Sequence, residues 1–267
     1  MSEIPLAVPA EAPYDARRFG GVARLLGEPA VARLRTAHVV VVGIGGVGSW
    51  TAEALARSGV GALTLIDLDH VAESNLNRQV LALESTIGAA KAEVMARRIA
   101  DIAPDCRVRI IEDFITQENC AALLPSEGII VDAIDAPRAK AAMIALCRAR
   151  KQPILVCGGA GAVRDAFSLR RGDLARTRGD ALLASVRARL RREHGFPREA
   201  GRAFGVQAVY FEAQRVAGQM CAPEAGAPLA CAGYGSLVTV TAALGFAVAG
   251  LALDLAALES APAMVGP

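Results

Sequence analysis

The stretch VVVVGIGGVGSWTAEALARSGVGALTLIDLD occupies residues 39–69 and decides the fold. Val39 to Val42 form an unbroken run of β-branched residues, which is typical of a central parallel strand covered on both faces. A helix is expected from Ser49 to Arg57, and a second buried strand from Leu63 to Ile66. This order of strand, turn, helix and strand is the repeating unit of a doubly wound parallel sheet.

The turn between the first strand and its helix contains Gly43, Gly45, Gly46 and Gly48. The first, second and fourth of these match the pattern G-x-G-x-x-G. Glycines at this spacing permit a tight turn, close approach of the backbone to a phosphate, and close packing of helix on strand. The N-terminal end of the following helix would direct its positive dipole at the anion. The turn therefore predicts a nucleotide site, with a purely structural glycine turn as the alternative.

Two acidic residues, Asp67 and Asp69, end the second strand, where a carboxylate can accept hydrogen bonds from ribose hydroxyls. This much is also found in proteins that only bind a dinucleotide. The run SNLNRQ at residues 74–79 is less common, because it adds amides and an arginine directly after the acidic strand end. The combination indicates cleavage of ATP.

Strands and helices continue to alternate up to about residue 160. The expected strands are 107–111, 128–131 and 154–156, and the expected helices are 17–35 (short and amphipathic), 88–100, 116–124 and 137–150. We therefore expect an α/β protein with a Rossmann-like, doubly wound, mostly parallel sheet and a smaller C-terminal extension of strand and helix. We expect one domain over 1–267, with a disordered proline-containing start at 1–13 and a nucleotide-binding core at 14–160.

The C-terminal part, 161–267, differs from the core in composition. Residues 164–202 contain eleven arginines and five acidic residues, whereas the net charge of the whole chain is only +2. A helix is expected at 181–192 with an arginine-rich face, and a strand at 207–211. A solvated surface is the simplest role for such a segment, and a phosphate-binding surface for RNA is the functional one.

Residues 237–253 are apolar and uncharged, close to the shortest length that spans a bilayer. The alternative is a helix in the core or at a dimer interface, and we expect this rather than a membrane span. The six cysteines lie far apart without a C-x-x-C pair, and there are three histidines, so no zinc site is expected. No secretory signal is evident, which favours a cytoplasmic protein with reduced thiols.

The motifs GIGGVGS, LIDLD, SNLNRQ, GAAKAEV and DAID together resemble the ThiF-type adenylating superfamily, which includes the ubiquitin-activating enzymes. The resemblance covers essentially the whole chain. RRFGGVARLLGEPA, CGGAGA and CAGYGS make it strongest with members that dehydrate N6-threonylcarbamoyladenosine beside the tRNA anticodon. That activity adenylates a carboxylate with ATP and closes a ring within the same molecule.

The resemblance implies a role for each polar residue near the turn. The glycines at 43–48 would hold the ATP phosphates, and Asp67 the ribose. Asn75 and Arg78 would grip the phosphates, and Lys91 would neutralise charge near the α-phosphate. Such positive charge is what a carboxylate attacking the α-phosphorus needs.

Asp135, in the DAID motif, would hold magnesium beside the nucleotide. The neighbouring Asp132 is expected to orient or cap the chain rather than to bind metal. Asp69 is either a ligand of the nucleotide or a turn residue, and Gln79 either contacts the nucleotide or supports its neighbours. Whether a monovalent cation also binds is left open by the sequence.

Cys231 lies where the resembling enzymes also have a cysteine. It is either a nucleophile that forms a transient thioester or a small buried residue, and ring closure within one molecule does not require the thioester. The resemblance also implies a homodimer in which residues 161–267 bind tRNA and form the dimer interface. It leaves room for a sulfur-relay or desulfurase partner. RNA rather than DNA is the expected nucleic acid.

Two other functions are weighed against this one. Activation of a ubiquitin-like or sulfur-carrier protein is the first, but relatives of that kind often have two C-x-x-C pairs, which this chain lacks. An NAD-dependent oxidoreductase is the second, with Asp67 on the adenosine ribose. That function leaves Asn75, Arg78, Lys91 and Asp135 unexplained.

Overall fold

A seven-stranded sheet forms the centre of the computed structural model, which describes residues 16–199, 201–212 and 235–257. The strand order is β3-β2-β1-β4-β5-β7-β6, and all neighbours are parallel except the antiparallel pair β6 and β7. The strands are β1 (His38–Val42), β2 (Ala62–Ile66), β3 (Arg107–Ile111), β4 (Ile129–Asp132), β5 (Ile154–Cys157), β6 (Leu169–Asp173) and β7 (Gln207–Phe211). The expected doubly wound, mostly parallel sheet is confirmed.

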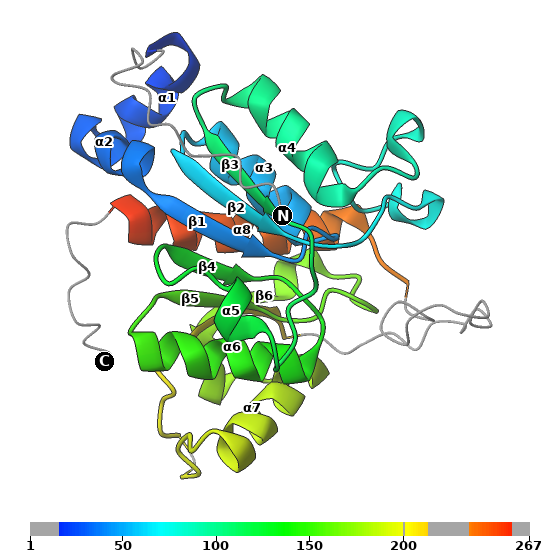
Figure 1. Ribbon diagram of the computed structural model, residues 1–267. Coiled ribbons are helices and arrows are strands. Elements are labelled where there is room, and N and C mark those ends of the chain that lie inside the picture. The colour runs from blue at the N-terminus through cyan, green and yellow to red at the C-terminus, as the bar shows by residue number, and fades with distance from the viewer. Residues whose placement is uncertain (1–15, 200, 213–234, 258–267) are drawn as a thin grey trace.

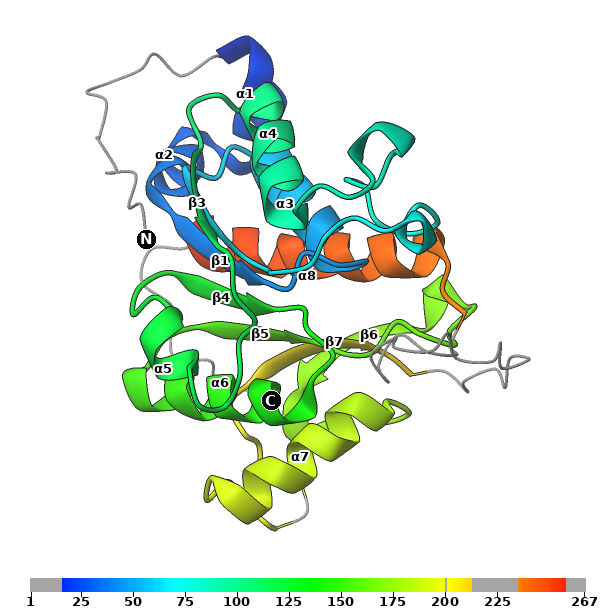
Figure 2. The same cartoon turned by 45° about the vertical axis from the view of Figure 1, so that its right-hand side comes forward.

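Helices cover both faces of this sheet (Figure 1). The helices are α1 (Ala16–Leu26), α2 (Glu28–Thr36), α3 (Gly48–Arg57), α4 (Lys91–Ile102), α5 (Cys120–Leu123), α6 (Pro137–Arg150), α7 (Ala181–Glu193) and α8 (Val238–Ala257). Short 3-10 turns are η1 (Glu73–Asn75), η2 (Glu84–Thr86), η3 (Ala166–Ser168) and η4 (Leu174–Arg176). α3, α4 and α8 lie on one face, and α5, α6 and α7 on the other, with α7 alongside α6 (Figure 2).

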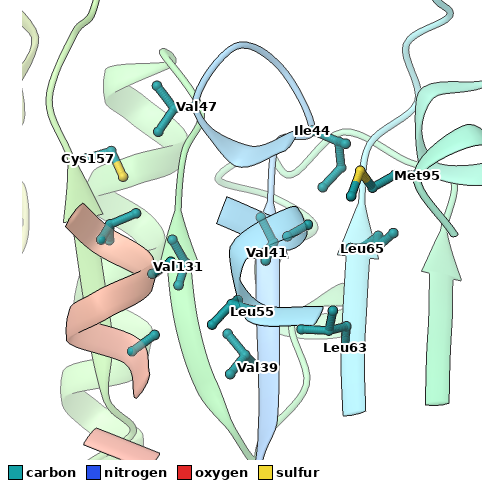
Figure 3. Packing of buried hydrophobic residues seen from close by; sticks show 14 of the residues in the cluster. Val39, Val41, Ile44, Val47, Leu55, Leu63, Leu65, Met95, Val131 and Cys157 are labelled. Carbon is teal, nitrogen blue, oxygen red and sulfur yellow. The ribbon is translucent and has the colours of Figure 1, made fainter. Parts of the chain in front are cut away.

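The valine run of β1 divides its side chains between the two faces, because successive strand residues point to opposite sides. Val39 and Val41 pack with the α3, α4 and α8 layer, whereas Val40 and Val42 pack with the α6 and α7 layer. Figure 3 shows the first of these clusters around Val39 and Val41. The run is therefore buried on both faces, as expected of a central strand.

Helix α8 has the length and composition of a membrane span but packs as a core helix. Val240, Leu244, Val248 and Ala252 are fully buried in the cluster with α3 and the sheet. The opposite side of the helix includes Phe246, which is 49% exposed. This packing favours the core-helix interpretation of residues 237–253.

The contact between α8 and α3 depends on Gly245. A Cβ at this position would lie 2.6 Å from the carbonyl oxygen of Val47 and 2.9 Å from Cβ of Trp50. We expect Gly245→Ala to lower the free energy of unfolding by about 1–3 kcal/mol, because α3 begins at the glycine turn and has little room to move. Gly250→Ala in the same helix is the matched control, since its Cβ would meet nothing within 4 Å. It should raise stability by about 0.5–1 kcal/mol through helix propensity, and equal urea-denaturation midpoints for the two variants would contradict the expectation.

The structure corrects three sequence expectations. Helix α4 begins at Lys91 rather than at Gly88, because Gly88 has φ +85° and Ala90 forms a β-bridge with His70. Helix α5 begins at Cys120, four residues later than expected, because Thr116 accepts backbone hydrogen bonds that form a turn. Strand β6 was not expected. The proposed disorder at 1–13 lies outside the described residues.

Candidate nucleotide and adenylation site

The candidate site lies where the strand order changes direction. β1 has β2 on one side and β4 on the other, and ligands of such sheets bind beyond the carboxyl ends of the strands at this point. The glycine turn follows β1 and the segment leading to Asp135 follows β4. The two segments touch: a Cβ at Gly43 would lie 2.8 Å from Cγ2 of Ile134 and 3.2 Å from its backbone nitrogen. Gly43 also has φ +87°, so its place at the switch point requires glycine.

The turn is closed on its inner side and open at Gly45. A Cβ at Gly48 would lie 1.8 Å from the carbonyl oxygen of Gly43, so the helix starts directly against the strand. A Cβ at Gly45 would meet nothing within 4 Å. One at Gly46 would approach the side chains of Thr241 and Arg78, at 3.1 Å and 3.5 Å. The geometry fits a turn whose backbone is approached by a phosphate.

Asp67 joins the glycine turn to the end of β2. Its carboxylate accepts hydrogen bonds from the backbone N–H of Ile44, at 2.5 Å, and from that of Asp69, at 2.8 Å. Burial raises the pKa of Asp67, although these hydrogen bonds and nearby Lys91 act in the opposite direction. Asp67 therefore holds the turn in place, in addition to the ribose contact predicted from the sequence.

Lys91 is brought to the site by Asp69. The Lys91 Nζ lies 2.8 Å from Oδ2 of Asp69, and the backbone N–H of Lys91 donates to the carbonyl of Asp69. The lysine side chain is 7% exposed and Asp69 is 52% exposed. Lys91 is thus a fixed positive charge beside the acidic strand end, and Asp69 has the identifiable task of positioning it.

Arg78 lies next to Gly46 and is held by its own segment. Its Nη1 donates to the carbonyl of Ser74 at 2.7 Å and to Oδ1 of Asn77 at 3.0 Å. The buried Asn75 accepts a hydrogen bond from the backbone N–H of Ala72, and its amide nitrogen donates none within the described residues. A guanidinium oriented in this way beside the turn suits a bidentate phosphate contact.

Two residues that support Arg78 were missed by the sequence analysis. Trp50 Nε1 donates to the carbonyl of Arg78 at 2.9 Å, and the hydroxyl of Thr241 donates to the same oxygen at 3.3 Å. Trp50 follows the glycine turn in the sequence, so its position gave a weak indication that it belongs to the site. Thr241 lies 163 residues away from Arg78 in the chain, and no local pattern indicates the contact.

Three buried side-chain oxygens have no hydrogen-bond partner in the described part of the chain. They are Ser49 Oγ, Gln79 Oε1 and Asp132 Oδ2. Ser49 lies in the first turn of α3, and Gln79 directly follows Arg78. Since buried polar atoms are normally satisfied, Ser49 and Gln79 are candidates for contact with a bound nucleotide or with water.

Asp135 and Asp132 differ sharply in their surroundings. Asp135 is exposed and its carboxylate has no hydrogen-bond or ion-pair partner among the described residues. An exposed carboxylate oxygen beside a phosphate site fits magnesium, which binds through one or two carboxylates and substrate phosphates. Asp132 is fully buried and pairs with the equally buried Lys140 at 2.9 Å. This pair favours the orienting role expected of Asp132 over metal binding.

The four cysteines in the described ranges are free thiols, and three of them are buried. Cys157 lies in the core cluster (Figure 3), and burial raises its pKa to about 12. Cys231 and Cys221 lie outside the described residues. Within the described ranges no group of three or more histidine, cysteine, aspartate or glutamate side chains is arranged to hold a metal ion.

The fold and site define a class of protein: the chain belongs to the ThiF family, which it matches over residues 20–194. It is 46% identical over 247 residues to the tRNA threonylcarbamoyladenosine dehydratase of Escherichia coli K12, covering 89% of this chain and 92% of that enzyme. A similar structure is that of the E. coli enzyme, TcdA, in complex with ATP, with a TM-score of 0.80 and 44% identity. It covers 90% of this chain and 94% of the other. The complex of TcdA with AMP has a TM-score of 0.82 at 43% identity and covers 92% and 97% of the two chains.

Proposed function

We propose that this protein is an ATP-dependent enzyme that dehydrates N6-threonylcarbamoyladenosine beside the tRNA anticodon to its cyclic form. One observation carries the proposal. Arg78 lies beside Gly46 of the glycine turn, Lys91 pairs with Asp69 after β2, and Asp135 follows β4, in a chain that is 46% identical to a tRNA threonylcarbamoyladenosine dehydratase. The overlap extends over about nine-tenths of both chains, so it includes the C-terminal half as well as the nucleotide core.

The first chemical step is adenylation of the threonine carboxylate. A carboxylate oxygen attacks the α-phosphorus of ATP and pyrophosphate leaves. Negative charge builds up on the transferring and leaving phosphates, and Arg78 and Lys91 supply fixed positive charge for it. Bound magnesium would add charge neutralisation and orientation of the phosphates, with Asp135 as the residue that holds it.

The second step closes the ring. A nitrogen or oxygen of the carbamoyl group attacks the activated acyl carbon and AMP leaves, so that one water is lost overall. Both reacting groups belong to one nucleoside, and positioning them in a near-attack geometry supplies much of the rate. Cys231 is not required by this route, and it stays a candidate for a covalent intermediate.

The wider assembly follows from the same proposal. The protein acts in the cytoplasm as a homodimer, and the exposed side of α8, with Phe246, is a suitable apolar interface. The chain is one functional domain in which residues 14–160 bind nucleotide and residues 161–267 contribute tRNA binding and dimerisation. A monovalent cation and a sulfur-relay or desulfurase partner are compatible additions.

Mass spectrometry of tRNA nucleosides tests the function. tRNA carrying threonylcarbamoyladenosine is incubated with the protein, ATP and magnesium, and the modified nucleoside should lose one water while AMP and pyrophosphate appear. Omission of ATP should leave the nucleoside unchanged. Unchanged tRNA in the complete reaction would contradict the proposal.

Two other measurements separate the alternatives. ATP–pyrophosphate exchange driven by a sulfur-carrier protein, and not by modified tRNA, would favour the carrier-activating function. Thermal stabilisation by NAD, and not by ATP with magnesium, would favour the oxidoreductase.

A further inference from the structure

Part of the arginine-rich segment lines a single pocket. Arg191, Arg192, Arg198 and Arg202 gather in a pocket of about 520 Å³, together with Glu199. A fifth arginine, Arg148, comes from the end of α6 and lies outside the segment that the sequence singled out. We call this group of five arginines and Glu199, with Phe196, the arginine–phenylalanine pocket.

Two of the guanidinium groups are held in position by aromatic rings. Arg148 lies over the ring of Phe196, with Cζ 4.4 Å from the centroid, and Arg191 lies over Phe204 at 5.1 Å. The two rings are themselves in edge-to-face contact, with centroids 5.0 Å apart. Arg191 also donates from Nε to the carbonyl of Pro197. Cation–π contacts of this kind fix the charges before any ligand arrives.

The pocket keeps an excess of positive charge after its own ion pairs are counted. Arg192 pairs with Glu193 at 2.5 Å, and Arg202 lies 3.6 Å from Glu199 with both side chains 67% exposed. The other three arginines of the pocket, Arg148, Arg191 and Arg198, take part in neither of these ion pairs. A site with this charge takes an anion, and arginine forks suit phosphate oxygens.

The aromatic rings indicate which part of a nucleic acid would bind. Phe196 is 3% exposed and Phe204 is 5% exposed, so neither offers a free face on which a base could stack. Recognition of single-stranded bases depends on such exposed platforms. The pocket is therefore suited to the phosphodiester backbone, whose binding is largely independent of sequence.

The distance between the arginine–phenylalanine pocket and the candidate nucleotide site indicates what kind of ligand binds in the pocket. α6 starts two residues after Asp135, and the N-cap Asp180 of α7 accepts a hydrogen bond from Gly159, which follows β5. Both helices begin at the site edge of the sheet and end at the pocket. With 14 and 13 residues they separate the two places by about 20 Å at 1.5 Å per residue. In Figure 1 the yellow loop after α7 and the cyan segment between β2 and α4 lie at opposite sides of the molecule.

We propose that the arginine–phenylalanine pocket binds backbone phosphates of the substrate RNA about 20 Å from the adenylation site. The inference rests on the proposed function and adds to it an RNA contact remote from the reacting nucleoside. A free nucleotide or phosphate is too short to connect the two places, whereas a folded RNA is long enough. The pocket contributes to substrate affinity and leaves the chemical steps to the candidate adenylation site at β1 and β4.

The test removes three exposed charges in Arg192→Gln/Arg198→Gln/Arg202→Gln. The matched control, Arg24→Gln/Arg97→Gln/Arg109→Gln, removes three exposed charges from α1, α4 and β3. With full-length modified tRNA, the pocket variant should raise KM at least about tenfold and leave kcat within about twofold. It should also reduce the slope of log Kd against log salt by about 2–3, since each lost phosphate contact removes about one unit. The control should change neither quantity.

A short substrate provides the second readout. A trinucleotide carrying N6-threonylcarbamoyladenosine reaches the candidate adenylation site but not the pocket, so the pocket variant and the wild type should process it with equal kcat/KM. The proposal would be overturned if the pocket variant kept the wild-type KM and salt slope with full-length tRNA. It would also be overturned if the variant lost as much kcat/KM with the trinucleotide as with full-length tRNA. If the wild type forms no cyclic product, the proposed function fails instead. The Kd of tRNA for the pocket variant against the control then still decides whether the pocket binds RNA.

Discussion

Arg78→Ala is expected to abolish adenylate formation, with ATP–pyrophosphate exchange falling by about 100- to 1000-fold. Arg78 is held by Ser74 and Asn77 beside Gly46, so its guanidinium has a defined position at the glycine turn. Its removal takes away positive charge where the transferring phosphate develops negative charge. The binding of tRNA should stay within about twofold of the wild type, because the arginine–phenylalanine pocket is remote from this position.

Two further variants refine this expectation. Arg78→Lys keeps a positive charge but loses the planar fork, and we expect an intermediate rate. Arg97→Ala removes an exposed arginine from α4 and should leave exchange unchanged. Exchange close to the wild-type rate in Arg78→Ala would remove Arg78 from the catalytic residues.

Lys140→Ala is expected to lower the free energy of unfolding by about 3–5 kcal/mol. Lys140 and Asp132 are both fully buried, and Nζ lies 2.9 Å from Oδ1 and 3.1 Å from the backbone carbonyl of Asp132. Without the lysine, the carboxylate of Asp132 is left buried and uncompensated. Urea denaturation of the variant and the wild type measures the loss.

The double variant Asp132→Asn/Lys140→Met tests whether the unpaired charge of Asp132 causes this loss of stability. It removes both charges and should recover most of the stability, because replacing a buried pair is far less costly than breaking it. Lys151→Asn is the control at the end of the same helix, where φ is +55° and asparagine is tolerated. A double variant as unstable as Lys140→Ala would show that packing, and not the unpaired charge, is responsible.

The decrease in the free energy of unfolding caused by Lys140→Ala should depend on pH. Burial raises the pKa of Asp132, and Lys140 counteracts this, so the loss of Lys140 raises the pKa further. The folded variant then binds a proton more readily than the unfolded chain, and its stability falls as pH rises through the folded pKa. The difference between variant and wild type should therefore be larger at pH 8 than at pH 5.

Local patterns predicted most of the sheet. β-branched runs and the glycine turn specified β1, α3 and β2 because each depends on neighbouring residues in the chain. Strand β6 escaped prediction because Leu169–Asp173 contains two arginines and no apolar alternation. It is a strand because it pairs with β7 at the edge of the sheet. The start of α4 was misplaced because an apparently helical pattern begins at Gly88, whose backbone is left-handed in the structure.

The sequence by itself determined the glycine turn, the mostly parallel sheet and the family, because these follow from short-range patterns and from motif order. Only the tertiary structure decided how the site is supported. It placed Asp69 against Lys91, Thr241 of α8 against the carbonyl of Arg78, and Arg148 of α6 in a pocket with Arg191 of α7. These contacts join residues far apart in the chain, and they form only when helices pack on the finished sheet. Contacts of this kind arise from tertiary packing, which the periodicity and spacing of residues in the sequence do not encode.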